Sequence, residues 1–430
     1  MQSRQRERAS GTNERNRRGD SAEAWAFPLR VWVVHWLLVQ IPATYAIRFG
    51  IPNAPSPPYG EMPPPMAGLA HWIVEPLRNW DGLWYRLIAL EGYAGGVQSA
   101  RAAFWPALPG IMHGGNLLTG WQVETVGYLL ANLAFLGALL ILYRLITYDY
   151  GDADVAKRTL WALALFPTSL FFSAVYTESL FLFLVVAALY LWRRDKIWLA
   201  GIVAIGAALT RSGGVFLVLP FLVLLWDRNR REWRDYFPDI IPAFFPALGP
   251  AIFGLILQRD QGNWNAFIDV QEQWNRYSAM PWETLQCAIN TCHTLGGEPD
   301  GISWSWWHSL TANPSWTTLR STEWRASVAN SDVLELAVTI LAIALALIGL
   351  RLLPFYYTAW VLPGLLIPLL QPSEVHALMS MPRFVLVLFP LFVLLGMLLR
   401  PRWIRVPAIV LSVTLLVLLT TQFALWYWVS

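Results

Sequence analysis

Four short polar stretches in this chain carry residues that could do chemistry. The first, residues 78–93, reads Arg-Asn-Trp-Asp-Gly-Leu-Trp-Tyr-Arg-Leu-Ile-Ala-Leu-Glu-Gly-Tyr and contains Asp81. The others hold Glu178 in Tyr-Thr-Glu-Ser, Arg211 in Thr-Arg-Ser-Gly-Gly, and Arg383 in Met-Pro-Arg-Phe. Each adjoins an apolar run of membrane-spanning length. Because a polar group at or near membrane depth is costly, such residues are candidates for function.

Carboxylates and arginines on one face would suit an enzyme that acts on a phosphorylated lipid. A carboxylate can accept the proton of an attacking hydroxyl, and arginines can neutralise a leaving phosphate. A leaving phosphate needs little protonation, so one base could suffice where glycoside hydrolases use two carboxyl groups.

Each of these residues also has a structural alternative. Asp81 could cap a helix that begins at Gly82, because Asp is a common residue at the N-cap position. Glu178 could be a structural partner of Arg211. Arg211 and Arg383 could extend to the outer headgroups of the membrane. The residues by themselves leave these alternatives open.

The composition indicates a membrane protein. Of 430 residues, 56% are hydrophobic and only 14% are charged, whereas about a quarter of the residues of soluble domains are charged. No basic patch is interleaved with aromatic residues, so we expect no nucleic acid partner. His71, His113 and His376 lack the spacing of metal ligands, and we expect no metal. The sequence contains neither a phosphate-binding glycine loop nor a nucleophile elbow.

The apolar runs predict an all-α polytopic membrane protein with about 11 transmembrane helices, since crossing the hydrocarbon takes about 20 helical residues. Arginine and lysine concentrate in alternate connections, which predicts a cytoplasmic N-terminus, an extracytoplasmic C-terminus and two large outer loops, 49–121 and 258–332. We expect residues 1–28 to form a disordered cytoplasmic tail and residues 29–430 the membrane domain. The predicted spans are 30–48, 122–143, 159–176, 178–192, 197–210, 212–226, 237–257, 333–350, 354–370, 384–399 and 404–428.

The outer loops contain three further features. Residues 104–112 are apolar but hold two prolines, so we expect an interfacial or re-entrant piece. The loop 258–332 is rich in tryptophan, which suits a belt at headgroup level or stacking on sugar rings. Cys287 and Cys292 both lie in this loop, and their spacing alone does not decide whether they form a disulfide.

The motifs resemble a known family. Residues 78–85 resemble the Trp-Asp-Gly-x-Trp-Tyr signature of the PIG-V mannosyltransferases, which are GT-C glycosyltransferases. Residues 166–181, Phe-Pro-Thr-Ser-Leu-Phe-Phe-Ser-Ala-Val-Tyr-Thr-Glu-Ser-Leu-Phe, closely match another stretch of that family. Shorter similarities follow in the family's order, at 89–93, 210–214, 266–274 and, more weakly, 383–384. The chain departs from the family at 104–109, where a common tyrosine is absent.

The resemblance implies a GT-C-type bundle with hexosyltransferase activity (EC 2.4.1 type). Such an enzyme would transfer a hexose, with mannose the first choice, from a polyprenyl-phosphate sugar to a hydroxyl of a lipid or glycan acceptor. The transfer would occur with inversion at the extracytoplasmic face, among membrane lipids, and without a cofactor. The membrane would be the endoplasmic reticulum in a eukaryote, where relatives act on glycosylphosphatidylinositol precursors, and the plasma membrane in a prokaryote.

The resemblance also implies roles for individual residues. Asp81 would be the general base, and Glu178 a supporting carboxylate of the catalytic site. Arg211 and Arg383 would contact the lipid phosphate. The remaining residues expected to bind substrate are Trp80, Tyr85, Arg86, Gln271 and Trp274.

A transporter or flippase of lipid-linked sugars is the main alternative. It would need polar groups near the bilayer midplane, whereas the four polar stretches fall at one predicted edge. Internal repeats, which build many transporter folds, are not evident in the sequence. A membrane scaffold would leave the stretch around Asp81 unexplained, so we expect an enzyme.

Overall fold

The computed structural model describes residues 2–52, 63–94, 100–228, 237–289, 331–374 and 376–429, with side chains from residue 23 onward. Within these ranges every regular element is a helix, apart from one isolated bridge between Arg276 and Ser373. The prediction of an all-α membrane protein is therefore confirmed.

Among the described residues, five helical segments are long and apolar enough to cross a membrane, so the prediction of about 11 complete spans is not established. These segments are Glu23–Phe49 in α1 (Gln2–Phe49), α5 (Val123–Tyr150), Pro238–Gln261 in α10 (Phe237–Ala243) and α11 (Leu248–Gln261), Val333–Leu352 in α17 (Ser331–Leu352), and α21 (Arg402–Ala424). Shorter apolar helices are α8 (Ile197–Thr210), η4 (Ser212–Leu217) with α9 (Val218–Arg228), α18 (Phe355–Leu370) and α20 (Phe389–Leu398).

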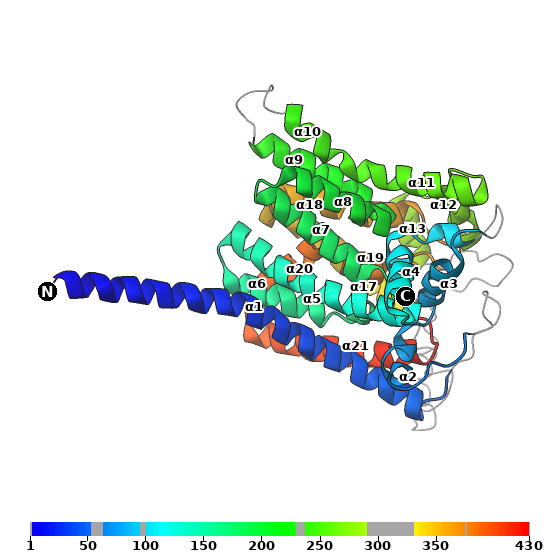
Figure 1. Cartoon of the computed structure of the whole chain (residues 1–430), viewed down its shortest axis with the longest axis horizontal. Helices are drawn as coiled ribbons and strands as arrows, with labels where there is room; N and C mark the ends of the chain where they lie inside the picture. The colour runs from blue at the N-terminus through cyan, green and yellow to red at the C-terminus, as the bar shows by residue number, and fades with distance from the viewer. Residues whose placement is uncertain are drawn as a thin grey trace.

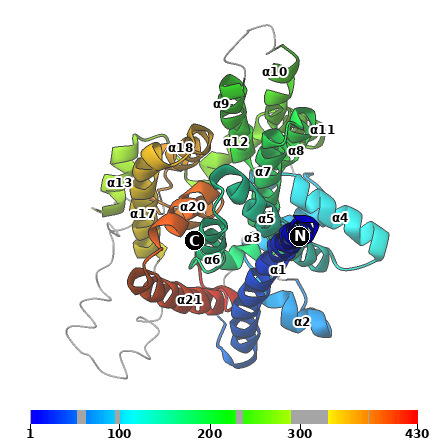
Figure 2. The ribbon, with the colours of Figure 1, turned by 90° about the vertical axis from the view of Figure 1, so that its left-hand side faces the viewer.

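The long helices form a bundle, shown from the side in Figure 1 and from one end in Figure 2. Helix α5 packs on α7 (Glu178–Arg193), α7 packs on α8, and α20 packs on α6 (Ala153–Ala164). Helices α1 and α21 lie side by side at one edge, although they come from opposite ends of the chain.

The predicted span 159–176 is wrong in its second half, because α6 ends at Ala164. Pro167 lacks a backbone N–H and disfavours helix at the residue before it. The chain then forms a buried turn containing η3 (Ser169–Phe172). Side chains satisfy the backbone there: Ser169 Oγ donates to Ala164 O at 2.8 Å, and Ser179 Oγ donates to Phe172 O at 2.6 Å. This turn leads directly into α7 and Glu178.

The N-terminal segment also differs from its prediction. A disordered tail was expected over residues 1–28, but α1 is continuous from Gln2 and projects from the bundle as one helix (Figure 1). The segment is rich in Arg, Glu and Ala, which favour helix, and the first proline within α1 is Pro28. Polarity thus separated this segment from the bundle but did not show its local structure.

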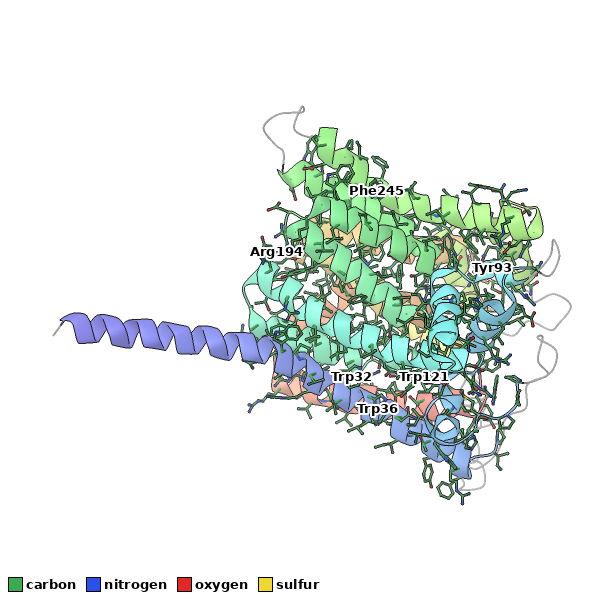
Figure 3. All side chains as sticks on the ribbon, viewed as in Figure 1. Trp32, Trp36, Tyr93, Trp121, Arg194 and Phe245 are labelled. Atoms are coloured by element: carbon green, nitrogen blue, oxygen red, sulfur yellow. The ribbon has the colours of Figure 1, made fainter. Side chains whose placement is uncertain are left out.

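The short elements of both predicted outer loops lie at the end of the bundle opposite the projecting part of α1 (Figure 1). In Figure 3, Tyr93 lies at this end and Arg194, from a predicted inner connection, lies at the other. Helix α4 is too short to cross a membrane, as expected for the proline-containing piece 104–112. The short elements of the two loops are α2 (Leu69–Ile73), η1 (Glu75–Leu77), α3 (Asp81–Glu91), η2 (Ala100–Ala103), α4 (Ala107–Thr119), α12 (Ala266–Asp269), η7 (Val270–Trp274) and α13 (Pro281–Ile289). Two further short elements, η6 (Phe245–Ala247) and α19 (Met381–Leu386), belong to neither loop.

Two expectations about the second outer loop concern residues that lie partly outside the described ranges. Cys287 lies in α13, but Cys292 does not fall within the described ranges. Most of the tryptophans of 258–332 also lie outside them, so the belt remains a prediction.

We expect Gly396→Ala to destabilise the bundle where α20 packs on α6. A Cβ at position 396 would lie 2.5 Å from Thr159 Oγ1 and 2.9 Å from the Thr159 backbone nitrogen, so the helices would have to separate. Overpacking of this kind costs about 1–3 kcal/mol. The measurement is the thermal unfolding midpoint in detergent, with Gly114→Ala as the control, because a Cβ there would meet nothing within 4 Å. Equal midpoints for the two variants would contradict this packing.

Candidate active site

Asp81 is the first residue of α3, and its side chain does not cap that helix. The preceding Trp80 has φ 57°, and no side-chain cap hydrogen bond is present at this helix start. The backbone N–H of Asp81 donates to the Tyr176 hydroxyl at 3.1 Å, and that hydroxyl donates to Asn79 O at 3.2 Å. The carboxylate is therefore available for another partner, which is Arg383 at 2.8 Å.

The four charged residues singled out in the sequence meet in one cluster. Arg383 Nη1 donates to Asp81 Oδ2 at 2.8 Å, and Arg383 Nε donates to Glu178 Oε1 at 2.9 Å. Arg211 Nη1 donates to the same Glu178 oxygen at 2.7 Å. Two carboxylates and two guanidinium groups balance in charge, and buried ions are tolerated when they are paired and hydrogen-bonded.

The members of this cluster differ in exposure, which separates their possible roles. The Asp81 and Arg211 side chains are each 16% exposed, that of Arg383 is 7% exposed, and that of Glu178 is 0% exposed. The Arg383 guanidinium lies over the rings of Phe171 and Tyr176, 5.0 and 4.7 Å from their centroids. Stacking and ion pairing together hold this arginine in one orientation. The structural alternative in which Arg383 extends toward the headgroups is therefore excluded.

A cavity of about 300 Å³ opens beside the cluster. Its polar wall includes Asp81, Arg211 and Arg383, and much of the remaining wall is aromatic or aliphatic. Glu178 does not line it. A cavity with a few convergent polar groups in an apolar lining is the usual form of a small-molecule site. The aromatic lining residues include Tyr85, Phe104, Trp105, Phe181, Phe216, Phe267, Trp274, Trp360, Phe384 and Trp428.

Three more of the expected substrate-binding residues line this cavity, namely Tyr85, Gln271 and Trp274. Burial raises the pKa of the Tyr85 phenol, and the nearby Asp81 and Glu178 carboxylates raise it further. Tyr85 is therefore a protonated hydroxyl at neutral pH, which suits hydrogen bonding to a substrate and not service as a base.

Two expected substrate-binding residues lie elsewhere. Arg86 Nε donates to Glu124 Oε1 at 2.8 Å, and Arg78 Nη1 donates to the same oxygen at 3.0 Å. Trp80 packs against Trp428 with ring centroids 5.2 Å apart. Neither Arg86 nor Trp80 lines the cavity. Their contacts are with Glu124 and with the C-terminal tryptophans, and not with the cavity.

Arg276 and Trp428 are among the lining residues that were not identified from the sequence. Arg276 directly follows the Gln-x-x-Trp segment, and its charge in an aromatic loop was an available signal. Trp428, near the end of the chain, reaches the cavity because α21 returns alongside α1, and no local pattern indicated this.

Among the residues that the structure describes, no group of three His, Cys, Asp or Glu side chains could hold a metal ion.

Comparison with known proteins supports the family resemblance. A family model described as mannosyltransferase (PIG-V) matches residues 38–219. Over 149 residues the chain is 29% identical to GPI mannosyltransferase 2 of Cryptococcus neoformans, covering 33% of this chain and 35% of the relative. Over 168 residues it is 31% identical to GPI alpha-1,6-mannosyltransferase 2 of Mus musculus, covering 36% and 34%. The chain thus spans about a third of the length of these relatives.

The resemblance to PIG-V mannosyltransferases is therefore confirmed over a region that contains Asp81, Glu178 and Arg211, but not Gln271, Trp274 or Arg383. Among solved structures, ArnT of Cupriavidus metallidurans bound to undecaprenyl phosphate aligns with 94% of this chain and 77% of its own. The TM-score is 0.40 at 14% identity, which is too low to establish a shared fold.

We expect Arg383→Gln to destabilise the protein strongly. The substitution leaves two carboxylates close together without their shared counter-charge, and breaking a buried ion pair costs about 3–5 kcal/mol. The measurement is chemical unfolding in detergent micelles. The matched control is Arg259→Gln, whose side chain is 88% exposed and, among the residues that the structure describes, pairs with Asp260 alone, so little change is expected. Equal stability of the two variants would show that the buried cluster does not hold the structure together.

Proposed function

We propose that this protein is an integral membrane mannosyltransferase that transfers mannose from a polyprenyl-phosphate donor to a hydroxyl of a lipid or glycan acceptor. One observation carries the proposal: the Asp81 carboxylate, ion-paired to Arg383, lines an aromatic and apolar cavity at one end of a helical bundle. The PIG-V match over Asp81, Glu178 and Arg211 supports the reaction class.

Asp81 would serve as the general base. Its carboxylate would accept the proton of the acceptor hydroxyl, whose oxygen would form a bond to the anomeric carbon of the sugar. The bond between that carbon and the phosphate oxygen would break, and the phosphate would leave with the electron pair. Attack from the face opposite the phosphate inverts the anomeric centre. The ion pair with Arg383 fixes the orientation of the carboxylate before substrate arrives.

We assign Glu178 a positioning role instead of the catalytic role expected for it. Its carboxylate is fully buried, does not line the cavity, and accepts hydrogen bonds from both Arg211 and Arg383. It therefore holds the arginines and does not meet the substrate. Of the two arginines, Arg211 is the more exposed, and it can approach a phosphate without giving up its contact to Glu178.

The position of the site suggests its side of the membrane. The cavity is lined in part by residues of α3 and α12, which lie at the end that carries the outer-loop elements (Figure 1), and Arg194 lies at the opposite end (Figure 3). The concentration of basic residues in the predicted inner connections supports a cytoplasmic position for that opposite end. The reaction would then occur at the extracytoplasmic face, in the endoplasmic reticulum of a eukaryote or the plasma membrane of a prokaryote.

We expect Asp81→Asn to abolish most transfer while the protein still folds and inserts. The amide keeps the shape of the side chain but cannot accept the proton, and loss of a general base lowers rates about 100- to 10,000-fold. The assay follows radiolabelled mannose from polyprenyl-phosphate-mannose into new lipid or glycan products in membranes. The matched control is Glu91→Gln in the same helix, whose carboxylate is 55% exposed and outside the cavity.

Wild-type turnover in the Asp81→Asn variant would remove the base assignment. Absence of label with the wild-type protein, when it is well inserted, would reject this donor, and other lipid-linked sugars would be tested in the same assay.

We also expect transfer to continue in the presence of excess EDTA. In the proposed mechanism, arginine guanidinium groups supply the positive charge that neutralises the leaving phosphate, so no step depends on a divalent cation. The initial rate is measured with EDTA, and again after Mg²⁺ or Mn²⁺ is added in excess. A rate that falls with EDTA and returns with one of these metals would contradict the expectation.

A further inference from the structure

Arg276 is a third arginine of the cavity wall, and the proposed mechanism gives it no task. It lies in the loop between η7 and α13, in the second outer loop, and its side chain lines the cavity together with Arg211 and Arg383. It falls outside the region matched by the family model, which ends at residue 219.

The backbone at Arg276 is held by a segment almost a hundred residues further along the chain. Arg276 forms an antiparallel bridge with Ser373, and Tyr277 N donates to Pro372 O at 3.1 Å. The guanidinium is itself oriented by the same segment, since Nη1 donates to Gln371 O at 2.8 Å. A side chain that is held in place before a ligand arrives loses less conformational entropy on binding.

Arg276 differs from the other two arginines in its electrostatic partners. Arg211 and Arg383 both form ion pairs with Glu178, at 2.7 and 2.9 Å. Among the described residues, no carboxylate lies within the 4.0 Å ion-pair distance of Arg276. Burial lowers the pKa of the Arg276 guanidinium from its usual range, which the Glu335 carboxylate offsets in part. This partly buried group remains charged at neutral pH and has no direct counter-ion among the described residues.

A partly buried guanidinium on a cavity wall, without a carboxylate in contact, favours an anionic ligand. Arginine binds phosphate through short, charge-assisted hydrogen bonds, and its planar geometry suits two phosphate oxygens at once. Arg383 is already engaged by two carboxylates, so a bound anion would have to compete with Asp81 and Glu178 for it. Arg276 has no such competitor among the described residues.

The wall next to Arg276 indicates what the anion is attached to. Trp360, Pro363, Ile367 and Pro368 of α18 line the cavity, and Gln371, the hydrogen-bond acceptor of Arg276, directly follows that helix. A charged group thus adjoins a wall of mostly apolar side chains from one apolar helix. This combination suits a phosphate joined to a hydrocarbon chain better than a free phosphate ion.

We propose that Arg276 is the anion-binding residue of the cavity and holds the phosphate of a lipid phosphoester. The inference rests on the proposed function for the identity of the lipid, because both the polyprenyl-phosphate donor and a phospholipid acceptor carry this chemistry. Arg211, which belongs to the cluster with Asp81, Glu178 and Arg383, would then contact the same phosphate or the sugar. Arg383 would orient Asp81.

A binding experiment on the purified full chain in detergent tests the subsite without any turnover. Calorimetric titration compares geranylgeranyl monophosphate, geranylgeraniol and inorganic phosphate, with the wild type and with Arg276→Gln, Arg276→Lys and the control Arg259→Gln. We expect the wild type and Arg259→Gln to bind the lipid phosphate at least about tenfold more tightly than either other probe. Arg276→Gln should lose this preference about tenfold or more, and Arg276→Lys should retain part of it.

Two outcomes of the titration would overturn the proposal. One is an unchanged affinity of Arg276→Gln for geranylgeranyl monophosphate, with a thermal midpoint like that of the wild type. The other is wild-type binding of inorganic phosphate as tight as that of the lipid phosphate, which would show that the apolar wall does not contribute.

Kinetics then distinguish the two sources of the phosphate and separate this proposal from the function. In the mannose-transfer assay, a raised KM for the donor in Arg276→Gln identifies the donor phosphate, and a raised KM for the acceptor alone identifies an acceptor phosphate. Transfer by the wild type with unchanged KM values in Arg276→Gln would reject the subsite and leave the function standing. No transfer by the wild type, with the expected binding pattern, would reject the function and leave the subsite standing.

Discussion

The ion pairs of Arg383 with Asp81 and Glu178 are the interaction on which the site depends. An ion removed from water is tolerated only when opposite charge and hydrogen bonds compensate it, and here each partner compensates the others. The same guanidinium also lies over the rings of Phe171 and Tyr176, so the carboxylate that faces the cavity is oriented by a group that is itself held by several contacts. Orientation of the reacting group and stability of the bundle therefore have one physical origin.

The buried turn between α6 and α7 brings this cluster together. Pro167 ends the preceding helix, and the chain returns through a compact turn whose polar side chains satisfy its own backbone. The turn positions two groups. The Tyr176 hydroxyl forms hydrogen bonds to the backbone on both sides of Trp80, and the Glu178 carboxylate accepts hydrogen bonds from Arg211 and Arg383. Irregular backbone at this depth is possible because it is enclosed by protein.

The balance of charge around the cavity also has a functional consequence. The cluster of two carboxylates and two arginines has no net charge, so it adds little long-range attraction for a phosphate beyond the direct contact that Arg211 can make. Arg276, on a loop held by the segment after α18, adds a positive charge that no described carboxylate neutralises by direct contact. The ion pairs of the cluster hold the structure, whereas the charge of Arg276 would meet the ligand. An anion could therefore bind and leave without disturbing the position of Asp81.

The sequence by itself determined the membrane class, the helical architecture, the approximate limits of most apolar helices and the four charged residues of the cluster. These follow from hydropathy and motif composition, which are local properties. Only the tertiary structure decided that Arg383 pairs with a carboxylate 302 positions away, that Arg86 points to Glu124, and that Arg276 enters the cavity. The direction of a charged side chain depends on which helices pack beside it, and neither periodicity nor motif spacing encodes those neighbours.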